Sequence, residues 1–221
     1  MPKVTEEYMN KKREAIVEAA YRVCLRKPVE MVTMMDVIEE TGLSQGGIYR
    51  FYKDLDEILC DMISKMRSDY NFIDDIERAT ADPEARFEDI VHHVCQVMAK
   101  VMEAHLLDIQ KINFDLTVLA INEPERAGKI IGGIKNKRGN FEYLATVMMP
   151  KLVKVCKKQK LKPKTDPKDI VEFISAAYVG IEMNCILTAC YGGAAMRVNS
   201  KPQPLFDVLA TTIITLFGGE A

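Results

Sequence analysis

The chain has 221 residues, of which 48% are hydrophobic and 28% are charged, and its formal net charge is −2. This balance excludes an intrinsically disordered chain, and the near-zero charge excludes a protein that binds nucleic acid through a global positive field. Any contact with DNA would have to come from a local arrangement of side chains.

Helical periodicity predominates along the chain, without convincing strand alternation. Apolar residues at helical spacing predict a first helix over residues 5–27, which Pro28 ends. Thr33 and Asp36 resemble a capping box at the start of a second, short helix. Gly42, which follows it, is the residue type that tolerates the positive φ common after a helix end.

A third short helix and a longer fourth helix follow. Ser44 is a good N-cap for the short helix that carries Ile48, and Asp54 with Glu57 forms a second box-like start. The fourth helix has one apolar face and runs to about Tyr70. Because it leaves the N-terminal bundle and continues into the rest of the chain, it favours mechanical coupling between the two parts.

Later helix starts are marked by an acidic residue followed by proline, a pair that caps free amides and fits the first helical turn. The predicted helices are 83–104, 106–121, 125–160 with a kink or break at Gly132-Gly133, 167–190, and 205–217. The chain is therefore predicted to be all-α, with about nine helices: an N-terminal three-helix helix-turn-helix unit joined to a larger C-terminal bundle.

The cysteines and the chain start carry no metal or targeting pattern. The six cysteines are scattered, without a CxxC pair or the Cys/His spacing of a zinc site, and we expect buried, reduced thiols. Residues 1–10 are polar and acidic and lack the apolar segment of a signal peptide. We expect no stretch that is long and uncharged enough to span a bilayer. The sequence predicts a soluble, cytoplasmic protein with no membrane contact, metal or cofactor.

Two short helices joined by a glycine-containing turn, over roughly Thr33 to Tyr52, are a known way to present a helix to the major groove. Glutamine and arginine can bond base edges, while tyrosine, threonine and lysine suit phosphate oxygens. Spacing alone leaves an ordinary helical corner as an equal alternative. The candidate DNA-binding residues are Thr33, Ser44, Gln45, Gly46, Gly47, Tyr49, Arg50 and Lys53.

Several motifs resemble the TetR family of bacterial transcriptional regulators. They are Arg13-x-x-Ile16-x-x-Ala19-Ala20, Thr33-x-x-x-Val37, the run from Gly42 to Tyr52, Glu57-Ile58-Leu59, and Asp166-Pro167 followed by Ala177 to Ile181. The resemblance implies a homodimer that binds double-stranded operator DNA, with a recognition helix over 44–50, a ligand pocket in the C-terminal bundle, and dimerisation through the last two long helices. Repression is the family default.

This resemblance predicts a DNA-binding domain over residues 1–53 and an effector-binding and dimerisation domain over 54–221. The expected dimer seam consists of Ile170, Ile174, Ala177, Ile181, Leu187, Leu205, Leu209, Ile213 and Leu216. A ligand that prefers a different tilt of the 54–70 helix would change the separation of the two recognition helices and lower DNA affinity.

Three residues depart from the family pattern. Leu55 stands where a lysine that contacts phosphate is usual, and Phe51 stands where a histidine is common. Both changes predict weaker or less salt-sensitive DNA binding. Ile38 replaces a usual alanine at a tight helix crossing, and we expect Gly46 and Gly47 to leave the room that it needs.

The N-terminal unit is net acidic, since residues 1–60 hold more Asp and Glu than Lys and Arg. This keeps an alternative function open: a helical scaffold or partner-binding protein that retains the helix-turn-helix shape without operator binding. An enzyme is not expected, because no HExxH, GxSxG or phosphate-loop motif occurs.

The C-terminal part is apolar and rich in methionine, a side chain that adapts to varied ligands. Polar residues inside apolar runs are better pocket candidates, because a buried polar group needs a partner. We expect a small hydrophobic or amphipathic effector. The candidate effector-binding residues are Met62, Met66, Asn113, Tyr143, Tyr178 and Glu182.

Overall fold

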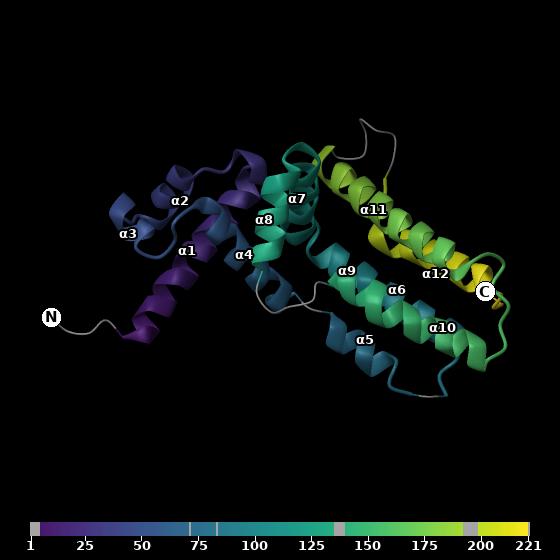
Figure 1. Cartoon of the computed structure of the whole chain (residues 1–221). Coiled ribbons are helices and arrows are strands. Elements are labelled where there is room, and N and C mark those ends of the chain that lie inside the picture. Colours follow the sequence, from purple (N-terminus) through teal and green to yellow (C-terminus); the bar gives the residue numbers. More distant parts are fainter. Residues whose placement is uncertain (1–4, 71, 83, 135–139, 192–198, 221) are drawn as a thin grey trace. The chain divides into compact units, whose positions relative to one another are not determined.

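The structure, a computed structural model, describes residues 5–70, 72–82, 84–134, 140–191 and 199–220 (Figure 1). These residues form helices and turns, without a strand, which confirms the predicted all-α class. The chain divides into two compact units, each assembled from two stretches of sequence. Unit 1 comprises Met1–Tyr70 and Lys111–Lys137, and unit 2 comprises Asn71–Gln110 and Arg138–Ala221.

Unit 1 is built on its first helix, against which the second and fourth helices pack. Its helices are α1 (Glu6–Arg26), α2 (Met34–Thr41), α3 (Gln45–Tyr49), α4 (Leu55–Asp69), α7 (Lys111–Asn122) and α8 (Pro124–Gly133). The predicted stripe of α1 is fully buried at Ile16, Ala19 and Ala20. In addition, α8 packs on α4, and α7 packs on the 3₁₀ turn Val29–Met31.

The capping box predicted at the start of α2 is present in both directions. The Asp36 amide donates to Thr33 Oγ1 at 3.2 Å, and the Thr33 amide donates to Asp36 Oδ2 at 2.7 Å. Lys27 Nζ lies 2.7 Å from the same carboxylate oxygen. Gly42 ends the helix with a φ of 66°, as the sequence predicts. The entry to the helix-turn-helix is therefore fixed by local chemistry.

Replacing Asp36 by alanine is expected to lower the free energy of unfolding at pH 7 by about 1 kcal/mol, because the capping box loses the hydrogen bonds that the Asp36 carboxylate accepts. The contacts from Lys27 and Thr33 hold the pKa of Asp36 at about 2, below its usual 3.8. The carboxylate therefore stabilises the fold above pH 3.8, and this contribution disappears as the pH falls through about 2. Denaturant titrations of both proteins across this range measure the difference; equal stability at pH 7 would contradict it.

Unit 2 is centred on the packing of α6 (Phe87–Ala104) against α12 (Pro202–Leu216). Its other helical segments are α5 (Ile73–Ala79), a π-helical turn (Leu106–Gln110), α9 (Asn140–Tyr143), a second π-helical turn (Leu144–Met148), α10 (Met149–Lys158) and α11 (Pro167–Tyr191). Phe87, Phe206 and Phe217 are fully buried in its core, and the rings of Phe87 and Phe217 lie 5.3 Å apart.

Several predicted boundaries were wrong. The helix expected from residue 83 begins at Phe87, because the carboxylate of Asp82 accepts from the Glu84 amide at 2.9 Å in a turn. The last helix begins at Pro202, earlier than predicted, because proline fits the first turn. The break at Gly132-Gly133 is confirmed by the end of α8.

One helix contradicts the expectation that no stretch is apolar enough to span a bilayer. Over Pro167–Cys190, α11 is long and apolar enough by length and composition, and its most apolar window of 18 residues has a mean hydropathy of 1.6. A single such helix is weak evidence for a membrane span, since the core helices of other proteins have the same length and composition. In this chain α11 packs against α12, and 28% of that window is buried.

Candidate DNA interface and effector cavity

The helix proposed to read DNA, α3, is a short element held at both ends. Ser44 caps its start by accepting from the Gly47 amide at 3.2 Å. Ile48 is fully buried and so fixes one face of the helix against the core of unit 1. Phe51 and Tyr52, which follow the helix, are also buried. Because one face is anchored, the other face presents its side chains in a fixed orientation.

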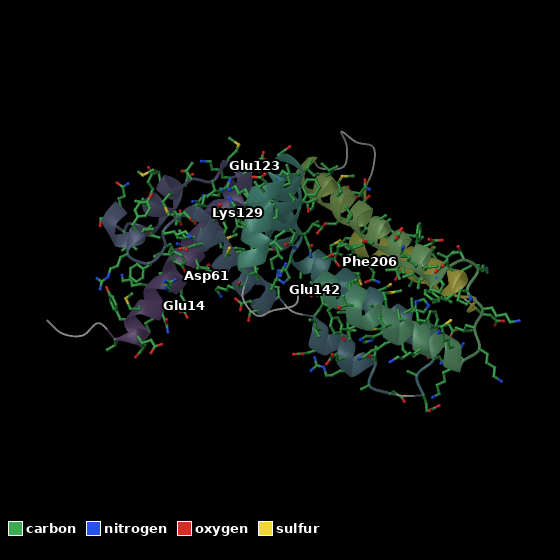
Figure 2. The ribbon with its side chains drawn as sticks, viewed as in Figure 1. Glu14, Asp61, Glu123, Lys129, Glu142 and Phe206 are labelled. Carbon is green, nitrogen blue, oxygen red and sulfur yellow. The ribbon has the colours of Figure 1, made fainter. Side chains whose placement is uncertain are left out.

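Tyr52 ties the end of this segment to two longer helices. Its hydroxyl donates to Asp61 on α4 at 2.8 Å, and the guanidinium of Arg13 on α1 stacks 4.8 Å from its ring centroid. Burial, followed by the contact with Asp61, raises the pKa of Tyr52, so the hydroxyl stays a donor. Figure 2 labels Asp61 and Glu14 in this part of unit 1.

Three of the predicted DNA-binding side chains are exposed and unengaged. Gln45, Tyr49 and Arg50 are exposed, and within the described residues none of them forms a hydrogen bond or ion pair. Tyr49 is 46% exposed. These side chains can therefore bind an external partner without first breaking an internal contact.

Two other predicted contacts are already occupied. The Thr33 hydroxyl donates to Asp36 Oδ2 at 2.7 Å, so its proton is used by the capping box. Lys53 Nζ lies 3.2 Å from Glu57 Oε1, and this contact raises the lysine pKa. A phosphate would have to compete with these carboxylates. Both residues remain exposed and stay predictions, with a smaller expected contribution.

The expectation that Gly46 and Gly47 make room for Ile38 was wrong. A Cβ atom at Gly46 would meet nothing within 4 Å, and one at Gly47 would lie 3.2 Å from Ser44 Oγ and 3.7 Å from Leu43 Cβ. Neither glycine faces Ile38, which is 9% exposed. The tight neighbour of Gly47 is therefore its own N-cap residue.

Some acidic residues of unit 1 are paired with basic residues outside the recognition segment. Glu40 on α2 binds Arg22 and Arg26 of α1 at 2.7 Å and 2.5 Å. The segment 44–53 itself contains Arg50 and Lys53 and no acidic residue. Because Lys53 is bound to Glu57, Arg50 is the positive charge of this segment that has no ion pair within the described residues.

Unit 2 contains a cavity of about 620 Å³, within the usual range for small-molecule sites. Its wall is almost wholly apolar, and Ser175, Tyr178 and Glu172 are its polar members. The apolar lining residues are Val91, Val94, Cys95, Met98, Leu144, Ala145, Met148, Met149, Leu152, Val171, Ile174, Ala176, Val179, Leu209 and Ile213. The lining side chains Glu172, Ala176 and Val179 are also exposed, so the cavity opens along α11.

The structure does not bring the six predicted effector residues together. Tyr178 lines the cavity, but Met62 and Met66 are buried in unit 1. Asn113 is exposed on α7, also in unit 1. Tyr143 is buried beside the cavity wall, where its hydroxyl bonds to Glu77 at 3.2 Å. The missed lining residues come from five helical segments, which no local motif could indicate.

A polar cluster lies around Tyr178. Gln110 and Glu182 are the two buried polar or charged side chains of the described residues, at 5% and 8% exposure. Gln110 hydrogen-bonds to Tyr178, yet its Oε1 atom has no hydrogen-bond partner within the described residues. Burial raises the pKa of Glu182 to about 7, because it favours the neutral form of the carboxyl.

Known proteins support the fold. No family model matches the chain. Over 57 residues, 26% of this chain, it is 46% identical to the uncharacterized HTH-type transcriptional regulator YfiR of Bacillus subtilis (strain 168). The match spans 28% of that relative's length.

Two solved structures align with nearly the whole chain. One is NalD of Pseudomonas aeruginosa, the secondary repressor of the MexAB-OprM multidrug efflux pump. Its TM-score is 0.62 at 14% sequence identity, and the alignment covers 96% of this chain and 100% of NalD. FadR of Thermus thermophilus, a TetR-family repressor in complex with lauroyl-CoA, gives 0.54 at 15% identity, covering 95% of this chain and 97% of FadR. At such identities the likeness establishes the fold.

Proposed function

We propose that this chain, whose fold is that of the TetR family, is a DNA-binding transcriptional regulator controlled by a small apolar or amphipathic effector. It would act in the cytoplasm as a repressor and not as an enzyme. The observation that carries the proposal is the set of exposed, unengaged side chains on the anchored recognition segment, Gln45, Tyr49 and Arg50. These residue types suit base edges and phosphates.

Residues 1–53 would supply the DNA contacts, and residues 54–221 would bind the effector and form the dimer. The apolar cavity in unit 2 supports an effector of the same character, because a ligand gains most from burying apolar surface. The FadR of known structure is in complex with lauroyl-CoA, a ligand that also joins an apolar part to a polar one.

A homodimer would bring two recognition segments to one operator. On α11, Phe173, Val179 and Met183 are exposed apolar residues, of which Val179 and Met183 lie one helical turn apart, and on α12 Val208 is 64% exposed. Exposed apolar stripes of this kind mark interaction surfaces. A second copy covering them would also account for the apolar character of α11.

The seam expected from the sequence consists of other residues. Ile170, Ile181, Leu209 and Ile213 are buried in the core of unit 2, so the predicted seam was mostly the inward face of these helices. The proposed dimer surface is therefore the outward stripe of Phe173, Val179, Met183 and Val208.

The effector signal would reach unit 1 along the chain. The chain passes from Gln110, in the polar cluster of unit 2, directly to Lys111, the first residue of α7 in unit 1. Lys111 Nζ donates to the carbonyl oxygen of Cys24 near the end of α1 at 3.2 Å and binds Asp115 at 3.0 Å. A ligand that moves Gln110 would therefore move a group that holds α1, in addition to the expected change of α4.

A gel-shift selection tests the function. The purified chain is mixed with fragments of its source genome at low salt, and retained fragments are titrated to give an affinity. We expect retention of a discrete fragment, and release when a cavity ligand is added. No retention of any fragment would overturn the proposal and favour the alternative, a scaffold that keeps the helix-turn-helix shape.

A further inference from the structure

The cavity in unit 2 offers no positive charge, and two buried hydrogen-bond acceptors lie beside one of its lining residues. Its charged lining residue is Glu172. Gln110 and Glu182 are not among the lining residues, but both are buried next to Tyr178, which does line the cavity. No Lys, Arg or His lines this cavity or is buried among the described residues. An anionic head group in the cavity would thus find no cationic partner there.

Tyr178 connects the cavity to these acceptors. It lines the cavity, packs edge-on against Phe206 with ring centroids 6.1 Å apart, and bonds to Gln110. Glu182 follows one turn later on α11, so both side chains lie on the same helix face. After burial, the charge of Glu182 is the next cause that raises the pKa of Tyr178.

A buried acceptor without a donor costs free energy, because it has lost its hydrogen bonds to water. Gln110 Oε1 is such an atom, because the amide of the same side chain is used by Tyr178. Glu182 adds a carboxyl whose charged form is destabilised by burial, and within the described residues this carboxyl has no cationic partner. A ligand that brings an N–H donor with positive charge would satisfy both groups at once.

We propose that the effector is a cationic amphiphile, a molecule with an apolar body in the cavity and a protonated amine bound by Glu182 and Gln110. This inference rests on the proposed function of the cavity as an effector site. It selects among the ligands that an apolar wall alone would admit: amines are preferred, whereas fatty acids and acyl thioesters with anionic ends are disfavoured.

Calorimetric titration of the full chain with three ten-carbon probes tests this selection. Decylamine, decanoate and 1-decanol share one apolar body and differ in the head group, and all are used below their micellar concentrations. Decylamine is expected to bind at least tenfold more tightly than decanoate, with decanol between them. Equal or tighter binding of decanoate would overturn the inference.

Two variants test whether the polar cluster around Tyr178 causes the preference for decylamine. Glu182→Gln should weaken decylamine binding at least tenfold and change decanol binding less than twofold. Glu103→Gln removes a carboxylate from an exposed position of α6 in the same unit and should leave both affinities unchanged. If both variants weaken decylamine equally, only the overall charge matters and the assigned site is wrong.

Two further measurements keep the test decisive. If thermal melting shows that Glu182→Gln does not fold, a second variant, Gln110→Leu, removes the unpaired acceptor. It is expected to reduce the preference for decylamine over decanol at least threefold. An unchanged preference would refute the role of the cluster. DNA retention without ligand is measured in parallel. A chain that binds DNA but prefers decanoate contradicts this inference alone, whereas a chain that binds decylamine but no DNA contradicts the proposed function.

Discussion

Replacing Arg50 by alanine is expected to weaken binding of the selected operator fragment by about 1–3 kcal/mol, the usual value of a base contact made by arginine. Arg50 is exposed at the end of α3 and has no ion pair within the described residues, so its guanidinium is available to a guanine edge or a phosphate. Anisotropy titrations of a labelled fragment at fixed salt measure the loss.

Two variants control for charge. Arg78→Ala removes the same charge from α5 in unit 2, where Arg78 binds Asp75, and should change DNA affinity less than twofold. Lys53→Ala should have an effect smaller than that of Arg50→Ala, because Lys53 is already bound to Glu57. An effect of Arg50→Ala no larger than that of Arg78→Ala would show that the segment does not read DNA.

The recognition segment could be predicted from sequence because its determinants are local. The box at Thr33 and Asp36, the positive φ of Gly42 and the Ser44 cap each depend on residues within three positions, and all are present in the structure. Sequence did not reveal that the Thr33 hydroxyl and Lys53 are engaged by neighbouring carboxylates. Side-chain competition of this kind depends on rotamers, which a pattern does not specify.

The cavity could not be predicted in the same way. Its wall joins α6, the π-helical turn Leu144–Met148, α10, α11 and α12, so its members are far apart in sequence. A methionine on an apolar helix face is equally suited to a core and to a pocket. Met62 and Met66 therefore looked the same as Met98 and Met148, although the first pair packs in unit 1 and the second pair lines the cavity.

Helix ends were harder to predict where the same capping motif can start either a helix or an isolated turn. An acid followed by proline starts α11, since Asp166 Oδ1 accepts from the Lys168 amide at 2.9 Å. The Asp82 carboxylate makes a similar contact to Glu84 in a turn that does not continue as a helix. The motif thus specifies a turn, and packing of the following apolar face decides whether a helix continues from it.

Substituting glutamate for Val208 is expected to convert the chain from dimer to monomer and to reduce operator affinity about 10²–10⁴-fold. A monomer loses the effective concentration that links two half-site contacts, which accounts for the size of the effect. Val208 lies on the outward side of α12 and is 64% exposed, so the charge should not disturb the core of unit 2. Sedimentation measures the mass, and circular dichroism confirms the helical content.

Ile121→Glu provides the matched control. Ile121 is more exposed than Val208, at 75%, but it lies on α7 in unit 1, whereas the proposed dimer surface belongs to unit 2. This variant should stay dimeric. A Val208→Glu chain that remains dimeric would contradict the proposed surface, and a wild-type chain that sediments as a monomer at micromolar concentration would contradict the dimer itself.

Dimerisation and effector binding should be linked because they use the same helix. Ala176 and Val179 belong both to the cavity lining and to the exposed side of α11, where Phe173 also lies. A ligand that shifts α11 must change the dimer surface, and by thermodynamic reciprocity the dimer must change ligand affinity by the same factor. Val208→Glu is therefore expected to alter the Kd for decylamine even though Val208 does not line the cavity. An unchanged Kd in a monomeric variant would show that the two sites are independent.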